Sequence, residues 1–150
     1  MNIGIRQDDD VDMRFTFSPK EMDLLDIRGV NFIHPINVRI YHIKKSIANF
    51  EILLNVSTRI QLDCSDCLES FEQDMVLDLK IDDEELEFMD DYECNENPNL
   101  INILPFIREE LIISSPDYAI CSDDCKGLCP KCGKNLNYGR CDCVIEENFE

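Results

Sequence analysis

Six of the nine cysteines in this 150-residue chain lie within 23 residues, from Cys121 to Cys143. Within this stretch, Cys129 and Cys132 stand three positions apart, and Gly133 follows the second cysteine. Two thiolates at this spacing can bind one metal ion, and the glycine permits a left-handed turn that directs backbone N–H groups at the sulfurs. The pattern is typical of a zinc knuckle, so metal binding is the leading interpretation of this segment.

Further cysteine pairs can complete four-sulfur sites. Cys141 and Cys143 follow a loop rich in turn-forming residues, and Cys64 and Cys67 form a CxxC pair expected at a hairpin turn. Eight cysteines suffice for two tetrahedral sites, so we expect one or two zinc ions, with Cys94 left as a free thiol. The favoured division has one site of Cys64, Cys67, Cys121 and Cys125 and a second, local site of Cys129, Cys132, Cys141 and Cys143. Exchanging the outer pairs is the alternative.

Two other uses of the cysteines are less consistent with the sequence. Disulfides are typical of small secreted scaffolds, whereas nine thiols in a reducing compartment favour metal ligation. A redox dithiol would be helped by the flanking Lys131 and Lys134, but it would not need four further cysteines beside it. A zinc-thiol redox switch or redox chaperone is therefore the alternative function.

An enzymatic role is not expected. Catalytic zinc keeps an open coordination position and commonly uses histidine or carboxylate ligands. His34 and His42 are the two histidines of the chain, and they do not form a metal-binding pair. Four-thiolate sites are closed, so we expect a structural metal and no small-molecule substrate.

The net charge of −18, from 32 acids and 14 bases, excludes broad coating of nucleic acid by a basic surface. Such a surface attracts basic partners, of which ribosomal proteins are an abundant class, although solubility alone would also explain the charge. No apolar run is long enough to cross a bilayer, and the first ten residues turn acidic, unlike a secretory signal. We therefore expect a cytoplasmic protein without a membrane partner.

Apolar residues alternate with polar ones over residues 11–17, 36–41, 50–64 and 75–81, which predicts antiparallel strands with one exposed face. Residues 47–64 could be one long bent strand or two shorter ones. Ser18, Pro19 and Glu21 have the pattern of a capping box, which predicts a short helix to about residue 26. A second helix is predicted over residues 99–115, with Pro105 suited to a first turn.

The predicted fold class is α+β: a small antiparallel β-meander or partly closed barrel, with a packing helix and a cysteine-rich zinc-knuckle tail. We expect a mainly β core over residues 1–120 that contains the hairpin CxxC, and a zinc-binding tail over residues 121–150 packed on it. Residues 82–97 hold nine acids and no base, which predicts a solvated loop.

Four basic residues crowd the cysteine-rich loop and make it the least acidic prominent patch of the sequence. With Asn135, Asn137 and Tyr138 they could contact rRNA or an acidic protein surface. The alternative is that these bases only compensate the charge of the thiolates. The candidate partner-binding residues are Lys126, Lys131, Lys134 and Arg140.

The motifs together resemble a known family. A CxxCLE hairpin follows an alternating strand, a helix ends at Ser-x-Pro before a cysteine, and the tail reads CKGLCPKCGKNLN from Cys125 to Asn137. This combination, over about residues 36–143, resembles the YceD family of large ribosomal RNA subunit accumulation proteins. The resemblance implies a metal-binding, non-enzymatic factor that acts in accumulation of large-subunit ribosomal RNA, with a ribosomal protein or an rRNA precursor as partner.

Overall fold

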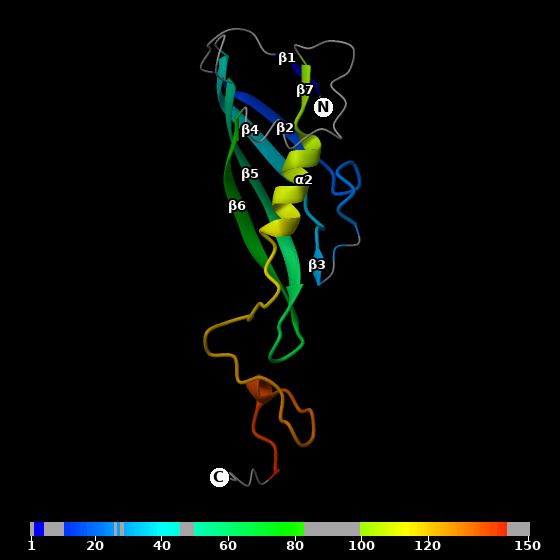
Figure 1. Cartoon of the computed structure of the whole chain (residues 1–150). Coiled ribbons are helices and arrows are strands. Elements are labelled where there is room, and N and C mark those ends of the chain that lie inside the picture. The colour runs from blue at the N-terminus through cyan, green and yellow to red at the C-terminus, as the bar shows by residue number, and fades with distance from the viewer. Residues whose placement is uncertain are drawn as a thin grey trace.

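The computed structural model describes residues 2–4, 11–25, 27, 29–45, 50–82 and 100–143. Within these ranges, the main element is an antiparallel sheet, with a small two-stranded sheet and one α-helix beside it and a 3-10 helix in the tail below it (Figure 1). The main sheet contains β2 (Met13–Phe17), β3 (Val30–Asn31), β4 (Ile36–Lys45), β5 (Phe50–Asp63) and β6 (Ser70–Asp82). The remaining elements are β1 (Asn2–Gly4), β7 (Leu100–Asn102), α2 (Leu104–Ile113) and η1 (Leu136–Tyr138).

Consecutive strands β4, β5 and β6 are antiparallel neighbours, which confirms the predicted meander. β2 pairs with β4 along one margin, and β3 pairs with β5 beyond the end of β4. Within the described ranges, β2 and β6 do not pair with each other, so the sheet is open. The alternative of a partly closed barrel is therefore wrong. β2, on one margin of the sheet, has five residues, β6, on the other, has 13, and no described strand joins these two margins.

The longest hairpin of the sheet shows whether the alternating residues before Cys64 form one long strand or two shorter ones. Residues 50–63 form one strand, β5, and its pairing with β6 runs without interruption from Glu51 opposite Asp82 to Asp63 opposite Ser70. The pairing of β4 with β5 contains an irregularity between Ile40 and His42. The β5–β6 hairpin is therefore a continuous ribbon that projects its CxxC turn away from the rest of the sheet.

The hydrophobic core lies between one face of the sheet and α2. Ile52, Leu54 and Val56 alternate along β5 with no exposed surface, as a half-buried strand requires. Ile107 and Leu111 of α2 pack against this face, also with no exposed surface. The predicted helix is present with its proline in the first turn, but it is shorter than predicted because residues 100–102 pair with β1.

The predicted helix after Ser18 is wrong. The capping-box contacts do form, since Glu21 accepts hydrogen bonds from the Ser18 amide (2.7 Å) and hydroxyl (2.6 Å). They close only a turn, because Asp23 adopts a left-handed φ of 53° and breaks the helical path. The turn places Met22 and Leu24 in the core, 3% and 0% exposed, with a spacing of two rather than a helical spacing.

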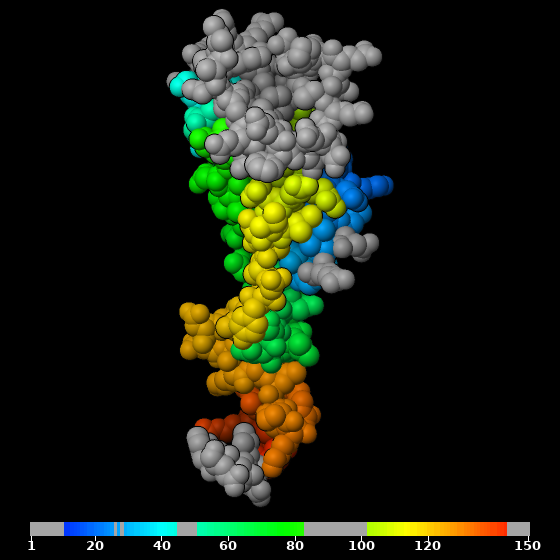
Figure 2. All heavy atoms as spheres, viewed as in Figure 1, coloured from blue at the N-terminus to red at the C-terminus, as the bar shows by residue number. Residues whose placement is uncertain are grey.

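After α2, the chain passes the tip of the β5–β6 hairpin and forms a narrow lobe below the sheet (Figures 1 and 2). This lobe is the cysteine-rich tail, residues 121–143. The predicted acidic loop, from residue 83 onward, and Cys94 lie outside the described residues. Among the residues that the structure does describe, no helix is long and apolar enough to cross a membrane.

Candidate metal centre

The turn of the β5–β6 hairpin holds Cys64 and Cys67, as the sequence predicts. The Cys64 amide donates to the carbonyl of Glu69 (2.9 Å), and the Leu68 amide donates to the carbonyl of Cys64 (2.9 Å). Leu68 has a left-handed φ of 61° and a side chain that is 68% exposed. This tight turn brings both sulfurs to one side, where they are buried.

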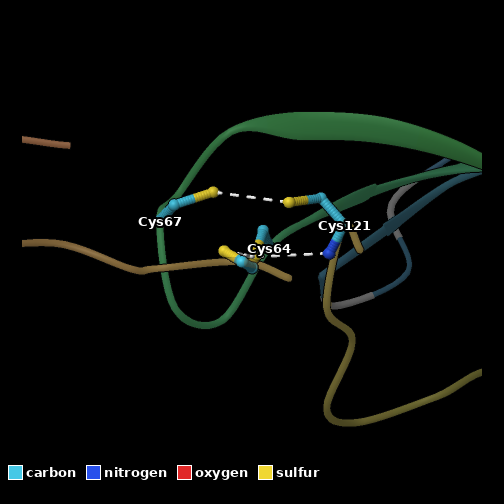
Figure 3. A group of neighbouring side chains, drawn as sticks. Cys64, Cys67 and Cys121 are labelled. Atoms are coloured by element: carbon cyan, nitrogen blue, oxygen red, sulfur yellow. Dashed lines mark hydrogen bonds between the residues drawn. The ribbon is translucent and has the colours of Figure 1, made fainter. Parts of the chain in front are cut away.

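Three contacts bring the segment after α2 against this turn. The Ser65 amide donates to the carbonyl of Ala119 (2.8 Å), and the Tyr118 hydroxyl donates to the carboxylate of Asp66 (2.8 Å). The amide of the next cysteine, Cys121, donates to the Cys64 sulfur at 3.4 Å (Figure 3). Sequence reasoning missed Tyr118 and Asp66, because a bond across 52 positions leaves no local pattern.

The first four-sulfur group combines the hairpin with the start of the tail. Cys67 and Cys121 have their sulfurs 3.7 Å apart (Figure 3). Cys64 and Cys125 have theirs 3.8 Å apart. All four sulfurs lie within 4.8 Å of one another, and none forms a disulfide. A tetrahedron with Zn–S bonds of about 2.3 Å has edges of about 3.8 Å, so the spacing fits one metal ion.

The second group is local to the tail. Its sulfurs also lie within 4.8 Å of one another, and they belong to Cys129, Cys132, Cys141 and Cys143. A tight turn holds the first pair, because the Gly133 amide donates to the carbonyl of Cys129 (2.8 Å). Gly133 has the left-handed φ of 71° that the knuckle pattern predicts. The eight cysteines are thus divided as the sequence analysis favours.

The metal-free thiols of the first group differ strongly in acidity. Burial opposes ionisation of Cys64, but backbone N–H groups directed at its sulfur, first that of Cys121, outweigh burial and lower its pKa to about 6. Burial, followed by the neighbouring sulfurs, raises the pKa of Cys121 to about 12. Cys64 can therefore become a thiolate readily, whereas Cys121 resists ionisation.

The second group repeats this asymmetry. The backbone N–H groups of Cys132 and Lys131 lower the pKa of Cys129 to about 6. The neighbouring sulfur of Cys132, followed by burial, raises the pKa of Cys143 to about 12. Four sulfurs this close repel one another when ionised, and a divalent cation among them would remove that penalty. Each donor set therefore has the charge and the geometry to hold one metal ion.

The tail also docks on the hairpin through its backbone. The Leu128 amide donates to the carbonyl of Asp66 (3.0 Å), and Gly127 packs directly against the same residue. The Asn137 side chain accepts from the Lys126 amide (2.7 Å) and donates to the Cys125 sulfur (3.5 Å). Asn137, predicted as a partner contact, therefore has a structural role that fixes the first group.

Replacing Gly127 with alanine should weaken this docking more than the same change at Gly133. Both glycines have a left-handed φ, 65° and 71°, so both variants should lose about 1 kcal/mol or more of local stability. An added Cβ at Gly127 would lie 3.2 Å from the Asp66 carbonyl oxygen, whereas no atom lies within 4 Å at Gly133. The measurement is the rate of limited proteolysis within the tail. Equal rates in the two variants would contradict this docking contact.

The predicted basic residues all lie on the surface of the tail. Lys126, Lys131, Lys134 and Arg140 are exposed. The Lys134 ammonium group donates to the carbonyl of Arg140 (2.8 Å), so these two positions lie side by side. The tail between its first and last cysteines has four bases and three acids, in contrast to the strongly acidic chain as a whole.

Comparisons with known proteins agree on one family. The family model described as large ribosomal RNA subunit accumulation protein YceD matches residues 52–149, which include both cysteine groups. A chloroplastic protein of Arabidopsis thaliana, named large ribosomal RNA subunit accumulation protein YCED homolog 1, is 47% identical over 47 residues. The aligned region is 31% of this chain and 15% of that relative. No solved structure matches the chain. The extent of the family match shows that this chain belongs to the YceD family of large ribosomal RNA subunit accumulation proteins.

Proposed function

We propose that this protein is a non-enzymatic zinc-binding factor of the cytoplasm that supports large-subunit rRNA accumulation or ribosome biogenesis by binding rRNA or a ribosomal protein. The family name supports the connection with large-subunit rRNA. The structural observation that carries the proposal is the convergence of eight thiols into two four-sulfur groups. The comparisons do not favour the redox-switch alternative.

The metal ions would have a structural role. In the first group, one ion would join the hairpin turn to the tail, because Cys64 and Cys67 come from the turn, and Cys121 and Cys125 from the tail. In the second group, one ion would close the local loop that carries Lys131 and Lys134. Two closed sulfur sites leave no open position for substrate, which supports a binding role over catalysis.

Reversing two charges on the tail tests the proposed contact surface. Lys131→Glu combined with Lys134→Glu should reduce co-migration of the protein with large-subunit precursors by about tenfold or more, because both bases would become repulsive toward phosphate. The matched control is Lys20→Glu with Lys44→Glu, which changes the net charge equally at exposed positions outside the tail. The measurement is the bound fraction in gradient sedimentation.

Each outcome separates the two interpretations of the basic loop. Loss of co-migration in the tail variant alone would support a partner contact. The zinc content of that variant should stay unchanged. Equal co-migration of the tail variant and the unmodified protein would remove this loop as the contact. Equal loss in both variants would indicate a general effect of net charge.

A further inference from the structure

We propose that β6 is a docking edge that binds a basic, extended polypeptide segment by adding it to the sheet as a further strand. The inference rests on the proposed binding role and specifies the kind of partner. β6 is 13 residues long and lies along one margin of the sheet (Figure 1). Among the described residues, β5 is its sole strand partner, so the outward backbone groups of β6 lack a neighbouring strand.

The β6 edge lacks two features that often protect a long edge strand, a proline and a bulge. Its sequence contains no proline, and its pairing with β5 continues over 13 positions without a bulge. Exposed edges pair with other strands, and proteins block them with bulges, prolines, covering segments or charged side chains. β6 carries charged side chains, and their sign selects the charge of an incoming strand. A regular edge of this length offers a ladder of hydrogen bonds to an incoming strand.

On the core side of the sheet, apolar side chains of β6 remain partly uncovered. Leu77 and Leu79 pack against the core but are only half-buried. Phe71, nearer the hairpin tip, is also half-buried. An added strand would place every second side chain beside them. Apolar residues at those positions would extend the core across the edge.

The opposite side of β6 is acidic. Four acids and one base point to this face, together with Val76, which is 62% exposed. They are Glu72, Asp74, Asp78, Asp82 and Lys80. Three of these acids have a base nearby: Asp74 lies 2.7 Å and Glu72 3.8 Å from Arg59, and Asp82 lies 3.2 Å from Lys80. Asp78 accepts from the neutral amide of Asn55 at 2.8 Å, so its charge is the one most directly offered to an incoming strand. The complementary strand therefore alternates basic residues on this face with apolar residues on the other.

The same charges disfavour two other occupants. In an antiparallel pair of two β6 strands centred on Val76, Asp74 would lie opposite Asp78 of the second copy, and like charges directly opposite destabilise a sheet. A nucleic acid would be repelled by the acidic face. Basic extended polypeptide is the occupant whose charge fits.

The test uses the full chain with its metal and a capped, fluorescein-labelled peptide of alternating lysine and valine, as long as β6. Fluorescence anisotropy at low salt should show saturable binding. Asp78→Lys should weaken binding about tenfold, because one attractive cross-strand pair becomes repulsive. The matched variant Asp117→Lys changes the net charge equally at an exposed position outside β6 and should stay within about twofold.

A second arm needs no variant of the protein. Methylating every second backbone amide of the peptide keeps its charge but removes the hydrogen-bond donors along one edge, so binding should fall about tenfold or more. Equal binding of both peptides, equal loss with Asp117→Lys, or no binding would overturn the proposal. A stable dimer that Asp78→Lys strengthens, because a lysine would then face Asp74 of the second copy, would also overturn it, in favour of a second copy. If the peptide fails to bind while co-migration with ribosomal precursors persists, the inference fails and the proposed function stands.

Discussion

Removal of bound metal should unfold the tail and leave the sheet folded. Between residues 121 and 143, Cys129 is the one residue among the buried hydrophobic positions, and the regular structure is a three-residue 3-10 helix. A segment without an apolar core depends on its cross-links, and structural zinc supplies on the order of 10 kcal/mol of binding free energy. Hydrogen exchange should therefore become fast throughout the tail after chelation, while the amides of β5 stay protected.

Variants with a single cysteine replaced should show the separate contribution of each site to zinc binding and to the folding of the tail. Cys125→Ser and Cys141→Ser each remove one ligand, so each should lower bound zinc by about one ion per chain. Cys125→Ser should also release the tail from the hairpin and expose Cys64 and Cys67 to thiol reagents. Cys141→Ser should leave those two thiols protected. Identical thiol reactivity in the two variants would contradict the division into a bridging site and a local site.

Truncating one buried side chain of α2 should lower the free energy of unfolding by a large amount for a single substitution. Ile107 has no exposed surface and packs in the core between α2 and the sheet, so Ile107→Ala should lower the free energy of unfolding by about 2–5 kcal/mol. Ile113 lies in the same helix but is 75% exposed, so Ile113→Ala should change it by about 0.5 kcal/mol or less.

The measurement is urea unfolding of both variants, monitored by far-UV circular dichroism under metal-replete conditions. Because α2 leads directly into the segment that contacts the hairpin, Ile107→Ala should also speed proteolysis of the tail. A loss from Ile113→Ala as large as that from Ile107→Ala would mean that α2 packs through a different face.

Patterns with a short period were sufficient to predict much of the fold. Alternation located β4, β5 and β6, and the proline near the start of α2 located its first turn. The cysteine spacing predicted that the two sulfurs of each CxxC pair lie close together, because two side chains three positions apart on a tight turn converge. These features depend on neighbouring residues, so the sequence displays them directly.

Features that depend on distant contacts were predicted poorly. The capping box at Ser18 is real, but the left-handed Asp23 ends the turn so that Met22 and Leu24 can both enter the core. Tertiary packing overrides local helix preference there. Whether the sheet closes depends on how far its two margins lie apart, and no local pattern encodes that. The docking of Gly127 on Asp66 likewise appears only when the tail reaches the hairpin.

The most direct test of the proposed metal centre is the zinc content of protein purified without added metal, with reactive thiols counted before and after chelation. We expect about two zinc ions per chain, with eight of the nine thiols released only by the chelator. The ninth, Cys94, is predicted to be a free thiol and should react from the start. Little zinc, together with thiols that react freely or form reversible disulfides, would contradict the structural-zinc account and favour a redox switch.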